Sequence, residues 1–371
     1  MVKKTAIISM KYSPGLYKEF GFMSDRLIAN GYSNDLFIAD EYRWMIKDDS
    51  HKKIFFTGES TLFSIVRNFV SYIFVKKYGI KKEIISEKYS FILFYNFHPV
   101  NVTITKFLKK NSPNCKIITY LHEPYMPDKG DYGFKKMIMI SIIETLQYNS
   151  IKKQSLTIVP SEVALKQLIT KYKIHSKRIR VIPLMIPEVK AKTSQKKYFT
   201  LIGNDHPAKG YDEFFQLVKL SCKNNLNFQF CLITRSNIES RVRSLSLEER
   251  ASLFIVNKEN ISDEEISNII IGSYALFKLD SAMTQSGIIP LSYQYNTPVI
   301  VRNIEGLTQH VKHRNTGYIV NDPIKLDELI AAINHIKLNI RDYKKNIQCE
   351  YKKYWSPNNW ERFYLSVFDN K

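Results

Sequence analysis

Two stretches of the sequence combine glycine, lysine and small polar residues in a pattern that suits a bound diphosphate. The first, Leu201–Tyr211 (LIGNDHPAKGY), passes from an apolar segment through a polar loop into an amphipathic segment. The second, Ser281–Val301, contains a small-residue turn, a helical segment and then a buried strand. Loops that lead into helices expose backbone N–H groups to a phosphate, and a lysine adds a point charge. Together the stretches predict two walls of one nucleotide-diphosphate site.

Lys209 and the turn Gln285-Ser286-Gly287-Ile288 are the residues that would act on the diphosphate. Departure of a nucleoside diphosphate builds negative charge on its oxygens, so a fixed ammonium group lowers the barrier. The turn would offer backbone N–H groups, and Gly287 would let the chain approach a phosphate closely. The alternatives are a surface lysine beside a turn and an ordinary helix cap.

A histidine next to a carboxylate marks the first half of the chain. His122 and Glu123 follow the apolar strand expected over Lys116–Leu121. In this position His122 can hydrogen-bond a sugar hydroxyl, and Glu123 can accept from an acceptor hydroxyl or pair with a lysine. His98, after the apolar run that begins at Phe91, is a second candidate for acceptor binding. A structural role is the alternative for both histidines.

Several cofactor-binding patterns are missing from the sequence. It has no DxD pair and no HxH or HExxH cluster, so metal-dependent chemistry has no ligand set. GxGxxG is absent, and the spacing from Gly203 to Lys209 does not fit a P-loop. No GxSxG nucleophile turn occurs either. We therefore expect neither a cofactor nor a metal.

The positive charge is concentrated in the first half of the chain. Residues 1–190 hold 31 Lys and Arg against 16 Asp and Glu, whereas the remainder holds 24 against 19. The lysines come mostly as doublets beside apolar and aromatic segments, which favours an anionic membrane surface as partner. A solvated lysine-rich face and a nucleic-acid surface are the alternatives, but no nucleic-acid-binding module is recognisable.

Short apolar runs alternate with helical patterns along the whole chain, which predicts βαβ units with mostly parallel sheets. We expect two Rossmann-like domains facing a cleft, with ligands at the carboxyl ends of the strands. The boundaries are 1–190, 191–354 and a final helical segment, 355–371, that crosses back to the first domain. No segment has the eighteen uncharged apolar residues that a transmembrane helix needs. The four cysteines are widely spaced and read as buried thiols.

The predicted elements follow the apolar periodicity. The expected strands are Thr5–Met10, Asp35–Ala39, Ile54–Thr57, Phe91–Tyr95, Lys116–Leu121, Leu156–Pro160, Ile179–Ile182, Tyr198–Leu201, Gln229–Thr234, Leu253–Val256, Tyr274–Lys278, Pro298–Val301 and Gly317–Val320. The expected helices are Phe20–Asn30, Leu62–Lys77, Val100–Lys110, Lys135–Ile151, Ser161–Tyr172, Tyr211–Asn224, Asp263–Ile271, Ile289–Gln294 and Leu326–Leu338. Ser161 stands where an N-cap belongs. The linker is expected at Pro183–Pro187 and the lysine-rich stretch after it.

These residues resemble the retaining glycosyltransferases of group 1 (family 4), which have the two-domain GT-B architecture. The resemblance spans most of the chain and is strongest from Ser155 to Val320. Its motifs are TIVPS from Thr157, RVIP from Arg180, LIG through KGYD from Leu201, NTPVI from Asn296, and EGL from Glu305. The resemblance implies same-face attack assisted by the leaving phosphate, and a histidine at position 122 that contacts the transferred sugar. It also implies that the first loop, with Gly15, approaches the donor through its backbone.

The chain departs from the family pattern on the donor side. The two glutamates that the family places before the PVI strand are here Met283 and Leu291, which matches a subgroup lacking the pair. The family's arginine before the loop lysine is Asn204, and Arg235 could replace it. Asn257 and Glu264 occupy the turn where the family reads its base.

The sequence thus predicts a retaining, metal-independent glycosyltransferase. Its donor would be a UDP-, GDP- or dTDP-linked sugar. Its acceptor would be a glycan or lipid-linked oligosaccharide in lipopolysaccharide, O-antigen or capsule synthesis, and we expect it at the inner face of the cytoplasmic membrane. The alternative from another class is a non-catalytic two-domain protein that binds a nucleotide or glycan.

Overall fold

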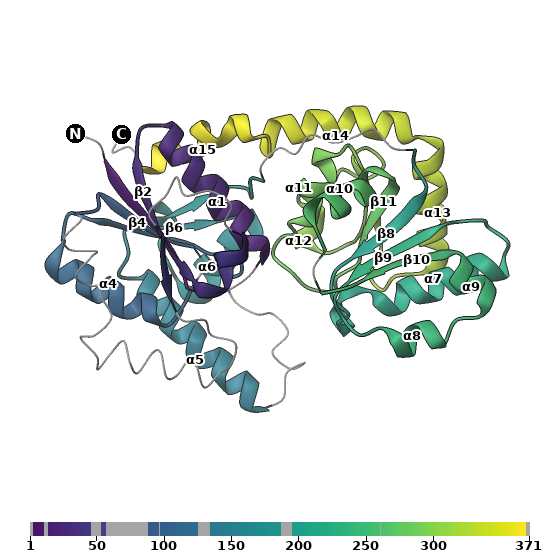
Figure 1. The fold of residues 1–371 in the computed structure, drawn as a ribbon, viewed down its shortest axis with the longest axis horizontal. Helices are drawn as coiled ribbons and strands as arrows, with labels where there is room; N and C mark the ends of the chain where they lie inside the picture. Colours follow the sequence, from purple (N-terminus) through teal and green to yellow (C-terminus); the bar gives the residue numbers. More distant parts are fainter. Residues whose placement is uncertain are drawn as a thin grey trace. The chain divides into compact units, whose positions relative to one another are not determined.

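The computed structural model describes residues 3–10, 14–45, 53–56, 88–95, 97–124, 134–186, 195–259 and 261–368. The chain forms two compact units (Figure 1). The first comprises Met1–Pro187 together with Trp360–Lys371, and the second comprises Glu188–Asn359. Pro183–Ile186, in the stretch expected as linker, has no regular secondary structure.

The first unit is built on a seven-stranded parallel sheet with the strand order β3-β2-β1-β4-β5-β6-β7. The strands are β1 (Lys4–Ser9), β2 (Ser33–Ala39), β3 (Lys53–Phe56), β4 (Phe91–Tyr95), β5 (Lys116–Tyr120), β6 (Leu156–Val159) and β7 (Ile179–Val181). Burial on both faces explains why strands such as β4, β5 and β6 are nearly continuous apolar runs that can be recognised in the sequence. The strand order reverses between β1 and β4, the position where open α/β sheets bind ligands at the carboxyl ends of their strands.

Helices cover both faces of this sheet (Figure 1). They are α1 (Pro14–Ala29), α4 (Val100–Asn111), α5 (Phe134–Ile151), α6 (Glu162–Tyr172) and α15 (Trp360–Phe368), with 3-10 turns at Asp40–Met45 and Ser176–Arg178. The N-cap prediction for α6 is confirmed, because Ala164 N donates to Ser161 Oγ over 3.1 Å. The predicted start of α1 is wrong: the helix begins at Pro14, since proline is tolerated in a first helical turn. The helix expected over Leu62–Lys77 lies outside the described residues.

The two faces of the first sheet have separate cores. Val100, Ile104 and Leu108 of α4 pack on one face with Ala6 and Ile8 of β1. On the other face, α1 and α15 share a core to which α15 contributes an aromatic row of Trp360, Tyr364 and Phe368. Phe368 stacks on Phe91 of β4 with ring centroids 4.4 Å apart. The helix α15 is therefore integral to the core of the first unit.

The second unit has a six-stranded parallel sheet with the order β10-β9-β8-β11-β12-β13. The strands are β8 (Tyr198–Ile202), β9 (Phe230–Thr234), β10 (Leu253–Asn257), β11 (Ser273–Lys278), β12 (Val299–Arg302) and β13 (Gly317–Val320). The helices are α7 (Tyr211–Lys223), α8 (Glu239–Arg243), α9 (Leu247–Ala251), α10 (Asp263–Ile271), α11 (Ile288–Gln294), α12 (Glu305–Thr308), α13 (Leu326–Leu338) and α14 (Ile340–Tyr354), with 3-10 turns at Pro207–Lys209 and Pro357–Asn359. The expected fold class of two Rossmann-like parallel-sheet domains is confirmed.

Four helices of the second unit were not predicted. The helices α8, α9 and α12 each have five residues or fewer, too short to show a helical period. The fourth, α14, does show one: Tyr343, Ile347 and Tyr351 are its buried residues and lie four positions apart. The tail residue Trp355, which follows α14, lies in the core of the second unit.

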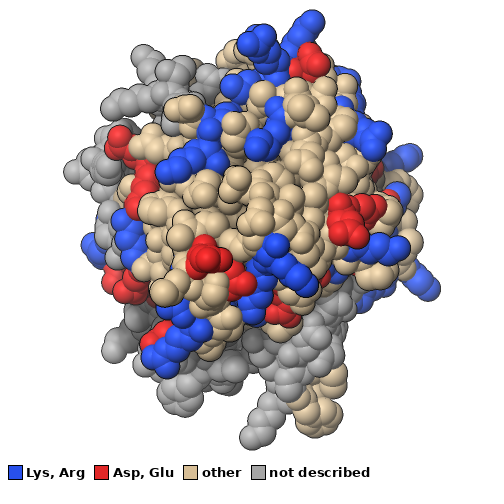
Figure 2. All heavy atoms as spheres, turned by 90° about the vertical axis from the view of Figure 1, so that its right-hand side faces the viewer, with Lys and Arg blue, Asp and Glu red and all other residues tan. Residues whose placement is uncertain are grey.

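Three further properties bear on function. All four cysteines are free, but only Cys115 and Cys231 are buried, so the expectation of four buried thiols is wrong for the exposed Cys349 and the half-buried Cys222. Among the described helices, none combines the length and hydrophobicity needed to cross a bilayer. On the face drawn in Figure 2, lysines and arginines are dispersed among acidic side chains and do not gather in one patch.

Candidate functional site

The carboxyl edge of the second sheet brings two loops into contact where the strand order reverses. β8 and β11 are adjacent parallel strands. In the segments that follow them, Ser281 N donates to Ala208 O over 2.9 Å. Gly210 has a left-handed backbone with φ of 69°, and a Cβ at this position would lie 2.3 Å from Leu279 Cβ. Only glycine therefore permits this contact between the two loops.

A buried cluster of charges lies at this edge. Lys278, the last residue of β11, places its Nζ 2.6 Å from Asp280 Oδ2, and the two side chains are only 9% and 6% exposed. Lys209 is close enough to respond to both. Burial and the Lys278 ammonium lower the pKa of Lys209, whereas the Asp280 carboxylate raises it. With two lysines against one carboxylate, the cluster favours an anionic ligand such as a diphosphate.

The loop that carries Lys209 is held in place by an arginine that the sequence did not single out. Arg241 of α8 binds Asp205 with both Nε (2.6 Å) and Nη2 (3.1 Å) and also contacts Asp212. Asp205 N donates to Ser236 Oγ over 2.9 Å. Because a bidentate arginine fixes both distance and orientation, it holds this loop in a defined geometry.

The second predicted loop rests on α12. A Cβ on Gly306 would lie 1.9 Å from the backbone oxygen of Met283, so the two backbones are in direct contact. Gln309 Nε2 donates to Thr284 O over 2.8 Å. Met283 packs half-buried against the core, as does Leu291 of α11. Apolar packing is therefore the role of the two residues that stand where the family has glutamates.

The turn that was expected to bind phosphate is only partly available. Gly287 is exposed and precedes α11. Ser286 is buried, and its Oγ accepts from Ile288 N over 3.2 Å. Gln285 is half-buried. The predicted turn therefore lies at the carboxyl edge, but the N–H group of Ile288 is already bonded to Ser286 within the turn.

The other donor-side candidates lie on the same edge with different surroundings. Asn204 and Arg235 are exposed after β8 and β9, and Glu264 is exposed in the first turn of α10. Asn257 Nδ2 donates to the backbone oxygens of Thr234 (3.3 Å) and Ser236 (2.7 Å). These bonds give Asn257 a structural role in holding the ends of β9 and β10 together.

In the first unit, His122 follows β5 and is buried against Glu19 of α1. Nε2 of His122 lies 3.3 Å from Glu19 Oε2, which also accepts from the hydroxyl of Tyr95 over 2.8 Å. Tyr120 and the tail residue Tyr364 share a hydrogen bond in the same cluster. Glu19 could not be recognised from the sequence, because only the fold brings this glutamate of α1 next to His122.

Burial keeps the Glu19–His122 pair uncharged. It raises the pKa of Glu19 to about 8, against an opposing effect of the Tyr95 hydrogen bond. It lowers the pKa of His122 to about 3. At neutral pH both groups are therefore neutral. A neutral imidazole beside a carboxylic acid can exchange hydrogen bonds with a sugar hydroxyl without carrying charge.

The remaining candidates of the first unit are less well placed. His98 is buried, and its Nδ1 accepts from Val100 N over 3.2 Å at the start of α4, so it has a capping role. Glu123 is exposed. Gly15 lies in the first turn of α1 and not in a loop, which corrects that expectation, although N–H groups in a first helical turn are open to ligands. Among the described residues, no group of three or more His, Cys, Asp or Glu could hold a metal ion.

Comparisons with known proteins agree with this architecture. The family described as "Glycosyl transferases group 1" matches residues 185–353. No curated protein sequence matches the chain. Solved structures similar to it include HepE from Anabaena in complex with UDP, with a TM-score of 0.72, 12% identity and 99% of each chain covered. TarM from S. aureus, in a complex that includes UDP, has a TM-score of 0.71, 11% identity and full coverage of both chains.

A third similar structure is WaaG, a glycosyltransferase involved in lipopolysaccharide biosynthesis, with a TM-score of 0.69 and 12% identity. The alignment covers 97% of this chain and 99% of WaaG. The residues that match the family include the cationic cluster of Lys209, Lys278 and Asp280 at the carboxyl edge of the second sheet. Residues 185–353 of the chain therefore match the group 1 glycosyltransferase domain, and its two units have the GT-B fold.

Proposed function

We propose that the protein transfers a sugar from a nucleotide diphosphate-sugar to a glycan or lipid-linked oligosaccharide, with retention and without a metal ion. The observation that carries this proposal is the cationic cluster of Lys209, Lys278 and Asp280 at the switch point of the second sheet. Charge builds on the diphosphate as it leaves, so fixed ammonium groups here stabilise the transition state more than the ground state.

On this proposal the two units have different chemical tasks. The second unit binds the donor, with Lys209 on the diphosphate and the turn at Gly287 beside it. In the first unit, His122 contacts a hydroxyl of the transferred sugar, and Glu19 holds the imidazole in position. Burial favours the protonated form of Glu19, which contacts His122, and a protonated carboxyl group is a poor nucleophile; this favours attack assisted by the leaving phosphate over a covalent intermediate.

The acceptor class and pathway are inferred from the relatives. WaaG is involved in lipopolysaccharide biosynthesis, and TarM was crystallised with α-GlcNAc-glycerol. We therefore place this protein in the synthesis of a cell-surface polysaccharide at the inner face of the cytoplasmic membrane.

An exposed apolar stripe on α5 supports membrane association. Phe134, Ile138 and Ile142 lie four positions apart on the helix and are 72%, 44% and 56% exposed. Lys135 and Lys136 stand beside the stripe in the sequence. Large exposed apolar side chains next to lysines match the requirements for lying on an anionic bilayer.

The transfer proposal is tested with Lys209→Ala. We expect turnover, followed as nucleoside diphosphate released from a panel of UDP-, GDP- and dTDP-sugars, to fall by about 10²–10³ while donor binding falls much less. Lys223→Ala, an exposed lysine at the end of α7, is the matched control and should leave both unchanged. The proposal fails if the wild-type protein neither binds nor hydrolyses any of these donors.

Membrane association is tested by sedimentation with vesicles containing phosphatidylglycerol. Ile142→Ser should weaken binding, whereas Ile169→Ser, which alters an exposed isoleucine on α6, should not. If both variants bind the vesicles equally well, α5 is not the membrane-binding element.

A further inference from the structure

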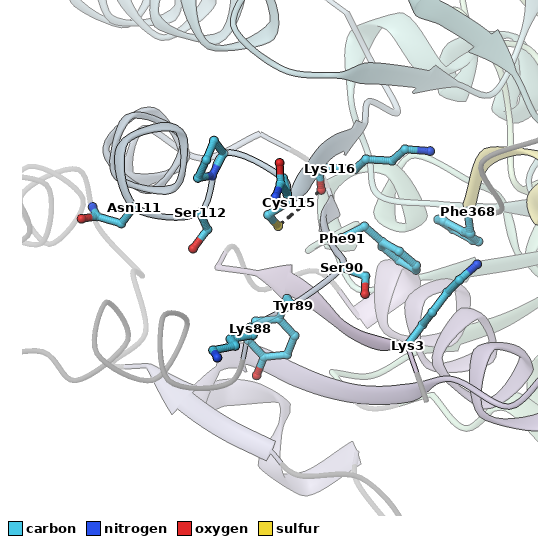
Figure 3. A pocket seen from close by; sticks show the side chains of 12 residues that line it. Lys3, Lys88, Tyr89, Ser90, Phe91, Asn111, Ser112, Cys115, Lys116 and Phe368 are labelled. Atoms are coloured by element: carbon cyan, nitrogen blue, oxygen red, sulfur yellow. Dashed lines mark hydrogen bonds between the residues drawn. The ribbon is translucent and has the colours of Figure 1, made fainter. Parts of the chain in front are cut away.

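A concave site lies in the first unit, at the edge of the sheet opposite to His122. It is a pocket of about 580 Å³ at the amino-terminal ends of β4 and β5. Its walls come from the residues leading into these strands, from the α4–β5 connection and from Phe368 at the end of α15 (Figure 3). The volume falls within the range of small-molecule sites. None of the residues of the candidate site lines this pocket, which lies at the opposite edge of the sheet from the usual ligand site of such folds.

The charge of the pocket is one-sided. Lys3, Lys88 and Lys116 line it, and none of the described lining residues is Asp or Glu. Lys3 and Lys116 extend on either side of the stacked rings of Phe91 and Phe368, and Lys88 lies toward the α4 side (Figure 3). Lysines that line one cavity attract an anion, because each ammonium group adds to the attraction.

The remaining lining groups are neutral and polar. Ser90, Ser112, Asn111 and Asn114 supply hydroxyl and amide groups. Cys115 is also there, but burial raises the pKa of its thiol to about 12, and Sγ contacts Lys116 O at 3.7 Å. It is therefore not a nucleophile. The described lining residues can bind the charged and hydroxyl groups of a ligand, and none of them is suited to catalyse a reaction of that ligand.

We propose that this pocket is a binding site for a small organic phosphate that carries hydroxyl groups, such as a sugar phosphate. The lysines bind the phosphate as point charges, and the asparagine and serine side chains bind the hydroxyls. The buried aromatic pair of Phe91 and Phe368 forms the apolar wall. Because Phe368 belongs to α15, the ligand also contacts the tail helix. It stabilises the packing of that helix on the first unit by mass action.

The test is calorimetric titration of the full chain with glucose 6-phosphate, glucose and inorganic phosphate, without any nucleotide sugar. We expect glucose 6-phosphate to bind most tightly, inorganic phosphate more weakly, and glucose not measurably. Lys116→Glu should weaken glucose 6-phosphate binding by at least about tenfold, the loss expected for a bond to a charged group. Lys110→Glu, at the exposed end of α4 and outside the pocket, should leave it unchanged.

Three results would overturn the proposal: no heat of binding at millimolar glucose 6-phosphate, equal binding of glucose, or equal loss in the Lys116 and Lys110 variants. Lys88→Gln provides a second variant if Lys116→Glu unfolds the protein, and it should also weaken binding. Lys209→Ala should bind glucose 6-phosphate as the wild type does. Failure of this site is thereby distinguishable from failure of the proposed transfer reaction.

Discussion

The ion pair of Lys278 and Asp280 allows the edge of the second sheet to be tested by one small change. Asp280→Asn keeps the shape of the side chain but removes its charge. The Lys278 ammonium, on a side chain only 9% exposed, then has Lys209 nearby and no carboxylate beside it. Removing one partner of a buried pair costs about 3–5 kcal/mol, because the other charge stays buried.

The expected change in melting temperature follows from the size of the unit. For domains as large as Glu188–Asn359, each 1 kcal/mol shifts Tm by about 2–4 °C, which gives a loss of about 6–20 °C. Calorimetry on the full chain would follow the transition of the second unit. The double variant Lys278→Met with Asp280→Asn should recover most of the loss, because no buried charge remains.

Asp280→Asn should also change the pKa of Lys209. The Asp280 carboxylate raises the pKa of Lys209 against the effects of burial and Lys278, so its removal lowers that pKa further. Turnover should then be lost at a lower pH than in the wild type as pH rises. Glu239→Gln, which breaks an exposed pair with Arg243, is the control and should change stability by less than about 1 kcal/mol. A wild-type melting temperature for Asp280→Asn would refute the buried-pair reasoning.

Two further predictions concern the other parts of the site. The raised pKa of Glu19 contributes stability that is fully present below pH 4.5 and lost as pH rises toward about 8. The stability advantage of the wild type over Glu19→Gln should therefore shrink across this range in urea unfolding, and a constant difference would contradict it. Gly306→Ala should cost about 1–3 kcal/mol and weaken donor binding, because its Cβ meets Met283 O. Gly21→Ala, with no atom nearer than 4.0 Å, should be neutral or stabilising in thermal unfolding, and equal losses would contradict the contact.

The strands could be predicted because parallel sheets demand apolar residues on both faces. β4 (FILFY) and β12 (VIVR) are examples in which almost every residue is buried. The boundaries that failed depend on local backbone chemistry. The start of α1 at Pro14 and the short helix α12 carry no periodic signal of their own.

The sequence predicts only those site residues whose chemical role depends on their neighbours in the chain. Lys209 and Gly210 form a short motif between a strand and a helix, so the sequence shows both together. Glu19, Lys278 and Asp280 gain their chemistry from partners that only the fold brings near. His98 and Asn257 were predicted as binding residues from their residue types, but in the structure their side chains bond to backbone groups, which gives them structural roles.

The two units hold their buried polar groups in opposite states of charge, and this difference carries a functional argument. In the second unit, the Lys278–Asp280 pair and Lys209 leave an excess of positive charge at the carboxyl edge. In the first unit, burial holds Glu19 and His122 neutral at pH 7. A cationic edge favours a diphosphate, and a neutral hydrogen-bonding pair favours a hydroxyl, which it can bind without attracting phosphate. Under the proposed function, the charge of the second unit suits the diphosphate of the donor, and the neutral pair of the first unit suits a sugar hydroxyl.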